Sequence, residues 1–204
     1  MGFGILLMGY FCVNVMALYP PLSFAMLIGY GLMIFALFRL APYHVHFYQC
    51  RNMAFLALPF AGYYTVYGLS AARVLPELAV FQSAVDVAVD WAYFAYGLLF
   101  QALLLWAILK LTLELEVYKL QVTALRNLIF VAVYHVTYLI AKLPLSFIQN
   151  NIGLFAVPVT LLRLIAVFCN LWLFYSCYRA ILPEGSDVTP KLPDLMGNMN
   201  RKEK

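Results

Sequence analysis

Charged residues are scarce in this sequence, and their scarcity excludes a soluble protein. Lysine, arginine, aspartate and glutamate make up 11% of the 204 residues, whereas 65% of the residues are hydrophobic. The mean hydropathy is +0.87. Soluble domains carry about 25% charged and about 45–50% apolar residues. The composition therefore predicts an integral membrane protein.

The sequence also lacks the motifs of familiar enzyme and metal sites. It contains no GxSxG, HExxH, P-loop or GxGxxG pattern, and its four cysteines form no CxxC pair. His44 and His46, with Cys50 nearby, have no evident fourth metal ligand. We therefore predict neither cofactor nor metal, and favour a protein that is not an enzyme. The net charge of +4 does not indicate a nucleic-acid partner, because the basic residues cluster at the ends of apolar segments.

Six apolar segments follow one another along the chain. The fourth is the clearest, because no residue from Trp91 to Leu109 is charged, and 19 helical residues nearly cross about 30 Å of hydrocarbon. We predict an all-α polytopic bundle of about six transmembrane helices in one domain, residues 1–182, with a disordered cytoplasmic tail over 183–204. The six segments cover residues 3–18, 22–38, 52–70, a stretch within 84–126, 127–147 and 154–178. Residues 39–51 are expected to form an aromatic connector at the headgroup level.

The distribution of lysine and arginine predicts the orientation of these segments. Of the 13 basic residues, ten lie in the connectors after the second and fourth segments or in the tail. The connectors on the other side contain one, Arg73. Because basic residues concentrate on the cytoplasmic side, both termini are predicted to be cytoplasmic, in a protein of the plasma (inner) membrane. The ten residues are Arg39, Arg51, Lys110, Lys119, Arg126, Arg179, Lys191, Arg201, Lys202 and Lys204.

Polar residues recur at helical spacing inside the last three segments. In the fourth, Asp86, Asp90, Tyr93, Gly97 and Gln101 are separated by 4, 3, 4 and 4 positions, which places them on one face of a helix. Such a face turns toward other helices or water rather than lipid. Together the three segments predict a polar pocket that opens to the outside. Its candidate residues are Asp86, Asp90, Gln101, His135, Tyr138, Lys142, Arg163 and Asn170.

The charged members of this set have two interpretations. A charge inside a span costs about 2.5–3.5 kcal/mol on insertion scales, so it normally has a partner or a function. Pairing of Asp90 with Arg163 or Lys142 would hold the helices together without any ligand. Alternatively, the same groups keep some valence free for a solute or ion. The sequence leaves both interpretations open.

The region after the fourth apolar segment carries a second pattern. Apolar residues from Leu104 to Leu125 repeat at alternating spacings of 4 and 3, which predicts a helix that continues out of the membrane with a heptad-like apolar face. This face could pack on its own bundle, or contact a second copy or another membrane subunit. Its partner-contact candidates are Leu111, Leu115, Tyr118 and Val122.

Two functions from different classes are compatible with these patterns. The first is a small transporter or solute-binding membrane subunit, with its pocket between the fourth, fifth and sixth segments. The second is a non-catalytic assembly or sensory subunit, in which the charges are structural and the helix over 104–125 docks a partner. The pocket favours the first function and the heptad-like face favours the second.

Overall fold

The structure is a computed structural model that describes residues 2–76, 84–142 and 152–181. Within these ranges the chain is helical and contains no strand, which confirms the all-α prediction. The predicted tail over 183–204 lies outside the described residues. The helices are α1 (Gly2–Asn14), α2 (Ala25–Leu40), α3 (Val45–Ala71), α4 (Ala84–Glu114), α5 (Tyr118–Lys142) and α7 (Ile152–Ala180), with two 3-10 turns, η1 (Met16–Leu18) and η2 (Pro20–Leu22), between α1 and α2.

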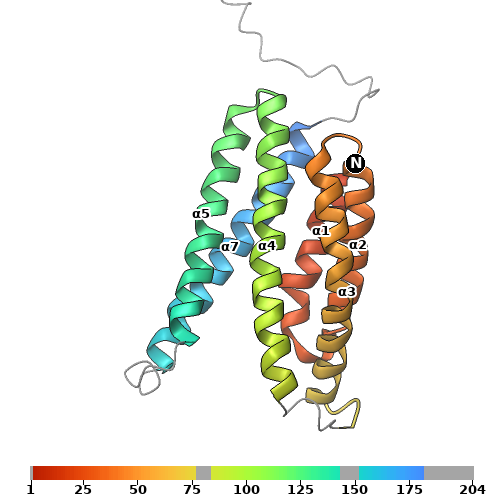
Figure 1. The fold of residues 1–204 in the computed structure, drawn as a ribbon, viewed down its shortest axis with the longest axis vertical. Coiled ribbons are helices and arrows are strands. Elements are labelled where there is room, and N and C mark those ends of the chain that lie inside the picture. The colour runs from red at the N-terminus through yellow and green to blue at the C-terminus, as the bar shows by residue number, and fades with distance from the viewer. Residues whose placement is uncertain (1, 77–83, 143–151, 182–204) are drawn as a thin grey trace, which may run out of the picture.

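The six helices form a closed ring. Each helix packs against the next along the chain, and α7 returns to pack against α1. The N-terminus, the α2–α3 connection, the α4–α5 turn and the end of α7 lie at the same end of the bundle (Figure 1). We call this the proximal end, and the opposite end, where α4 begins and α5 stops, the distal end.

Three of the described helices are long and apolar enough to cross a bilayer. They are α4, α5 and residues Ala156–Ala180 of α7. Helices α1 and α2 are apolar but contain 13 and 16 residues. At about 1.5 Å per residue they extend about 20 and 24 Å, which is less than a bilayer core of about 30 Å. Three long apolar helices are thus compatible with a membrane protein, whereas α1 and α2 form a shorter apolar pair.

Helix α3 begins earlier than the sequence predicted. Residues 45–51, expected to belong to a connector, form its first turns, and the helix has 27 residues. His44 caps it, because its Nδ1 atom accepts a hydrogen bond of 3.1 Å from the backbone N–H of His46. Its Nε2 atom lies 3.2 Å from a carboxylate oxygen of Glu114, which links the proximal ends of α3 and α4.

The continuous helix predicted from Leu104 to Leu125 is wrong. Helix α4 ends at Glu114, the chain turns with Glu116 at a φ of 56°, and α5 starts at Tyr118 in the opposite direction. The heptad pattern fails because α5 folds back onto α4 and buries a different face, which includes Leu120 and Ala124. Of the four partner-contact candidates, Leu111 is buried in α4, whereas Leu115, Tyr118 and Val122 are exposed.

Small residues allow α1 and α2 to approach closely. A Cβ atom added to Gly9 would lie 2.7 Å from the carbonyl oxygen of Gly29, and one added to Gly29 would lie 2.8 Å from that of Gly9. The two backbones are therefore in direct contact at this crossing, an arrangement typical of helices that associate in membranes.

The buried core is concentrated in the proximal part of α4, α5 and α7. The buried residues of α4 begin at Tyr96, and those of α5 end at His135. In α7, the first buried residue among the described side chains is Ala166. By contrast, α3 has buried residues from Phe47 to Ser70. Toward the distal end, α5 and α7 lean away from α4 (Figure 1), so less side-chain packing is available there.

Candidate functional site

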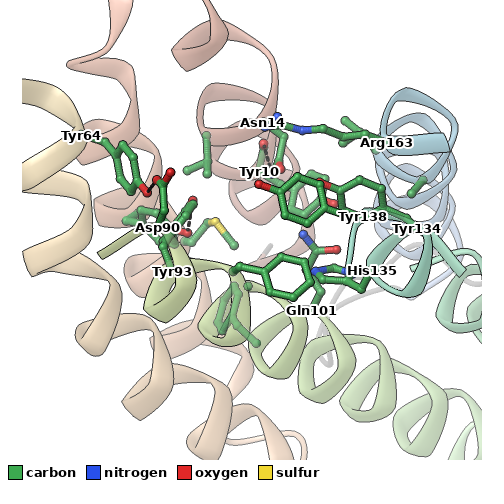
Figure 2. A pocket seen from close by; sticks show the side chains of 18 residues that line it. Tyr10, Asn14, Tyr64, Asp90, Tyr93, Gln101, Tyr134, His135, Tyr138 and Arg163 are labelled. Carbon is green, nitrogen blue, oxygen red and sulfur yellow. Dashed lines mark hydrogen bonds between the residues drawn. The ribbon is translucent and has the colours of Figure 1, made fainter. Parts of the chain in front are cut away.

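A cavity of about 170 Å³ lies inside the ring, and all six helices line it. Its polar lining comes from hydroxyl, amide, imidazole, carboxylate and guanidinium groups (Figure 2). A water molecule occupies about 30 Å³ of the liquid, so the space suits several waters or a small solute. The lining residues with polar or charged side chains are Tyr10, Asn14, Tyr30, Tyr64, Asp90, Tyr93, Gln101, Tyr134, His135, Tyr138 and Arg163.

A second cavity, of about 340 Å³, adjoins the first. The two share Val13, Tyr64, Tyr93 and Arg163 as lining residues. The second is lined further by residues of η1, η2 and the C-terminal part of α3. Because η1 and η2 connect α1 to α2 at their distal ends, the combined space extends from the centre of the ring toward the distal end.

Tyrosines of α3 hold the two carboxylates of α4. The hydroxyl of Tyr63 donates a 2.9 Å hydrogen bond to Asp86, and the hydroxyl of Tyr64 donates a short one to Asp90. The spacing explains the match, because Asp86 and Asp90 lie one turn apart on α4. These neutral donors satisfy part of each carboxylate's hydrogen-bonding capacity and leave its negative charge in place.

The cations do not pair with these carboxylates. Within the described ranges, no lysine or arginine, Arg163 included, forms an ion pair with an aspartate or glutamate. Lys142 lies over the ring of Tyr138, with its Nζ atom 5.6 Å from the ring centroid. The absence of a pair between Asp90 and Arg163 or Lys142 in the described residues argues against the structural-pairing interpretation. Its physical reason is the divergence of α5 and α7 from α4, which separates the charged faces (Figure 1).

Asp90 and Arg163 line opposite sides of the cavity. Figure 2 shows Asp90 beside Tyr64 on one side, and Arg163 near Tyr138 and Tyr134 on the other. Arg163 is half-buried and Asp90 is accessible. The cavity thus contains one negative and one positive side chain, each with hydrogen-bonding capacity to spare.

Amide and imidazole groups lie deeper in the ring. His135 is buried, and its Nδ1 atom donates to the carbonyl oxygen of Val131 over 2.7 Å, so the neutral ring keeps Nε2 as an acceptor. Gln101 lines the cavity beside it (Figure 2). Asn170 does not line the cavity; its Nδ2 atom donates a 2.9 Å hydrogen bond to the hydroxyl of Tyr10, which does.

Aromatic rings fill the walls between the charged groups. Phe94 stacks on Tyr138 with ring centroids 4.9 Å apart, and Tyr93 lies 4.9 Å from Tyr64. The hydroxyls of Tyr30 and Tyr93 are 3.2 Å apart. Ring faces attract cations, and tyrosine hydroxyls can both donate and accept hydrogen bonds. These walls can therefore contact both polar and apolar parts of a solute.

The structure brings together five of the eight site residues predicted from the sequence. Asp90, Gln101, His135, Tyr138 and Arg163 line the cavity. Lys142 and Asn170 contact the lining residues Tyr138 and Tyr10, whereas Asp86 is hydrogen-bonded to Tyr63, which does not line the cavity.

Sequence reasoning missed the contribution of the first three helices. Tyr10 and Asn14 of α1, Tyr30 of α2 and Tyr64 of α3 complete the ring around the cavity. The tyrosines at positions 63, 64 and 67 were a signal, because hydroxyls repeated within an apolar helix need partners.

A comparison with known proteins finds no family model, no curated protein and no solved structure that matches this chain.

Proposed function

We propose that the chain is a six-span membrane protein whose central cavity receives a small polar solute from outside the cell. It acts as a small transporter or as the solute-binding subunit of one. Both termini and the proximal end are cytoplasmic, and the distal end faces outward.

The positions of basic residues support this orientation. Arg39, Arg51, Lys110, Lys119, Arg126 and Arg179 belong to the proximal parts of their helices or to the connections there. Arg73 and Lys142 lie at the distal end. An excess of lysine and arginine marks the cytoplasmic side of a membrane protein.

The separation of Asp90 from Arg163 carries the functional proposal. Charged groups within a membrane protein normally pair with each other, because an unpaired charge in hydrocarbon is costly. Here the two opposite charges line one cavity without forming an ion pair. Water must then solvate both groups in the empty protein, and a polar solute can replace that water when it binds.

Accessibility of Gly97 tests this proposal directly. Gly97 lines the cavity, and a Cβ atom added to it would meet nothing within 4 Å. Gly31 is a matched control, because its Cβ position is equally open but it is not a lining residue. Gly97→Cys and Gly31→Cys would each be introduced after replacement of the four native cysteines, and intact cells treated with a membrane-impermeant thiol reagent.

We expect the reagent to label Gly97→Cys from outside and to leave Gly31→Cys unlabelled, because a lipid-facing thiol remains uncharged and inaccessible to the reagent. A bulky residue at the same position, Gly97→Phe, should abolish solute binding while Gly31→Phe preserves it. Equal labelling of the two cysteines, or no labelling of Gly97→Cys, would show that the cavity does not open to the outside.

A second candidate function is that of an assembly or sensory subunit. The observation that favours it is the exposure of large apolar side chains around the α4–α5 turn, where Leu115, Tyr118 and Val122 are 47%, 73% and 47% exposed. Leu115→Asp should then weaken association with a partner or with a second copy, measured by co-purification and by mass photometry. An unchanged oligomeric state together with unchanged binding partners would contradict this candidate.

A further inference from the structure

The cavity presents its two opposite charges from different helices. Asp90 belongs to α4 and Arg163 to α7, two helices that are separated by α5 in the ring. Both side chains line the same space, on opposite sides of it (Figure 2). A ligand inside the ring can therefore meet a carboxylate at one end and a guanidinium at the other.

Each charged group is equipped for a different chemical partner. Asp90 accepts from the hydroxyl of Tyr64, which leaves further acceptor sites on the carboxylate. Rings of Tyr64 and Tyr93 lie beside it, 4.9 Å apart, and ring faces attract ammonium groups. Arg163 presents a planar set of N–H donors, which suits a carboxylate or a phosphate.

We propose that the ligand is a small zwitterion, with its ammonium group at Asp90 and the Tyr64 and Tyr93 rings, and its anionic group at Arg163. The proposal rests on the proposed function, because it assigns a substrate class to the same cavity. The class includes amino acids and betaines.

Charge balance favours a zwitterion over a simple ion. The charges of Asp90 and Arg163 sum to zero, so a zwitterion leaves the occupied cavity neutral and gives each charge a partner. A simple anion would satisfy Arg163 and leave Asp90 unpaired, and a simple cation would do the reverse. A charge without a ligand partner keeps only its contacts with water and neighbouring hydroxyls, so a zwitterion gains one more charge-assisted contact than either simple ion.

Three related probes separate these possibilities. L-leucine carries both charges, leucinamide keeps the ammonium group, and 4-methylpentanoate keeps the carboxylate. Alanine, tyrosine and glycine betaine extend the zwitterion set to other sizes. Binding to the full-length protein in detergent would be measured by the rise in melting temperature and by titration calorimetry. We expect at least one zwitterion to bind ten times or more tightly than either singly charged probe.

Two variants should change the selectivity in opposite directions. Asp90→Asn retains Arg163, so it should bind the zwitterion at least tenfold more weakly and favour 4-methylpentanoate over leucinamide. Arg163→Gln should likewise lose the zwitterion and favour leucinamide. Glu116→Gln is the control: it also removes one carboxylate, but from the exposed turn between α4 and α5, outside the lining of both cavities, so it should bind like the original protein.

The opposite shifts distinguish recognition from unfolding, because a misfolded variant would lose all three probes. Preference of the original protein for a singly charged probe would overturn the proposal, and so would zwitterion binding that neither variant changes. If Gly97→Cys is labelled from outside but no zwitterion binds, the outward-opening cavity stands and the zwitterion assignment fails.

A zwitterionic lipid headgroup has the same chemistry as a free solute. Glycerophosphoethanolamine would serve as the headgroup probe in the same measurements. Tighter binding of this probe than of any amino acid or betaine would retain the zwitterion assignment and overturn solute transport. Binding of the free amino acids or betaine alone supports both proposals.

Discussion

The two halves of α4 have different surroundings although they belong to one uninterrupted helix. Between Tyr96 and Thr112 the helix contributes nine buried residues, whereas none of the residues from Ala84 to Ala95 is buried. The distal half instead carries Asp86 and Asp90, which are hydrogen-bonded to tyrosines of α3. The difference indicates that the proximal half contributes most of the packing stability, while the distal half provides polar chemistry beside a cavity.

A void in the proximal core should have the largest effect on stability. Leu104 is 1% exposed, so Leu104→Ala should lower the free energy of unfolding by about 2–5 kcal/mol. Leu99→Ala, at a position on the same helix that is 59% exposed, should change it by less than about 0.5 kcal/mol. Thermal or denaturant unfolding in detergent measures both. Equal effects would mean that the buried face of α4 has been assigned incorrectly.

The next effect concerns the crossing of α1 and α2, where close contact between the two backbones should contribute to stability. Gly9→Ala places a methyl group 2.7 Å from the Gly29 carbonyl oxygen, so the helices must separate. We expect a loss of about 1–3 kcal/mol, the usual cost of overpacking. Gly31→Ala, which has open space, should be neutral or slightly stabilising because alanine favours helix. An equal fall in the melting temperatures of the two variants would contradict the close contact between α1 and α2.

A further effect concerns the hydrogen bond between Asn170, which is buried in the core, and Tyr10, which lines the cavity. Tyr10→Phe removes the acceptor of the Asn170 amide, and a buried donor without a partner costs about 1–3 kcal/mol. Tyr118→Phe is the control, since Tyr118 is 73% exposed. Unfolding of both variants in the same detergent provides the measurement, and we expect a measurable loss only for Tyr10→Phe.

The smallest effect concerns the two charges of the cavity. A double-mutant cycle on Asp90 and Arg163 should give a coupling energy below about 0.5 kcal/mol, because the two groups form no ion pair. A cycle on Asp90 and Tyr64 should give about 1 kcal/mol, the usual contribution of one hydrogen bond. Coupling of about 2 kcal/mol or more between Asp90 and Arg163 would instead indicate structural pairing and remove the argument for a ligand.

The sequence predicted helices well where apolar runs were long, and less well where polar residues interrupted them. The segment predicted over 154–178 corresponds to α7, Ile152–Ala180. The start of α3 was missed because Tyr43 and the two histidines are typical of a connector, whereas the His44 cap allows the helix to begin there. The heptad-like pattern through Leu115 was misleading, because apolar spacing alone does not reveal where a chain reverses direction.

Only those parts of the candidate site that belong to a single helix could be predicted from the sequence. Periodicity alone places Asp90 and Gln101 on one face of α4, since both belong to the same helix. It cannot assign their partners. The donors to Asp86 and Asp90 come from Tyr63 and Tyr64, more than twenty positions earlier in the chain.

Hydropathy and periodicity are local properties of the chain, so the sequence alone predicts apolar helices and the faces of those helices that carry polar residues. Only the tertiary contacts show that the six described helices close into a ring, and that α1, α2 and α3 also contribute lining residues to the cavity. They also show that tyrosines, rather than cations, contact the two carboxylates. The physical reason is that α5 and α7 diverge from α4, and the angle between packed helices depends on contacts distributed over the whole bundle.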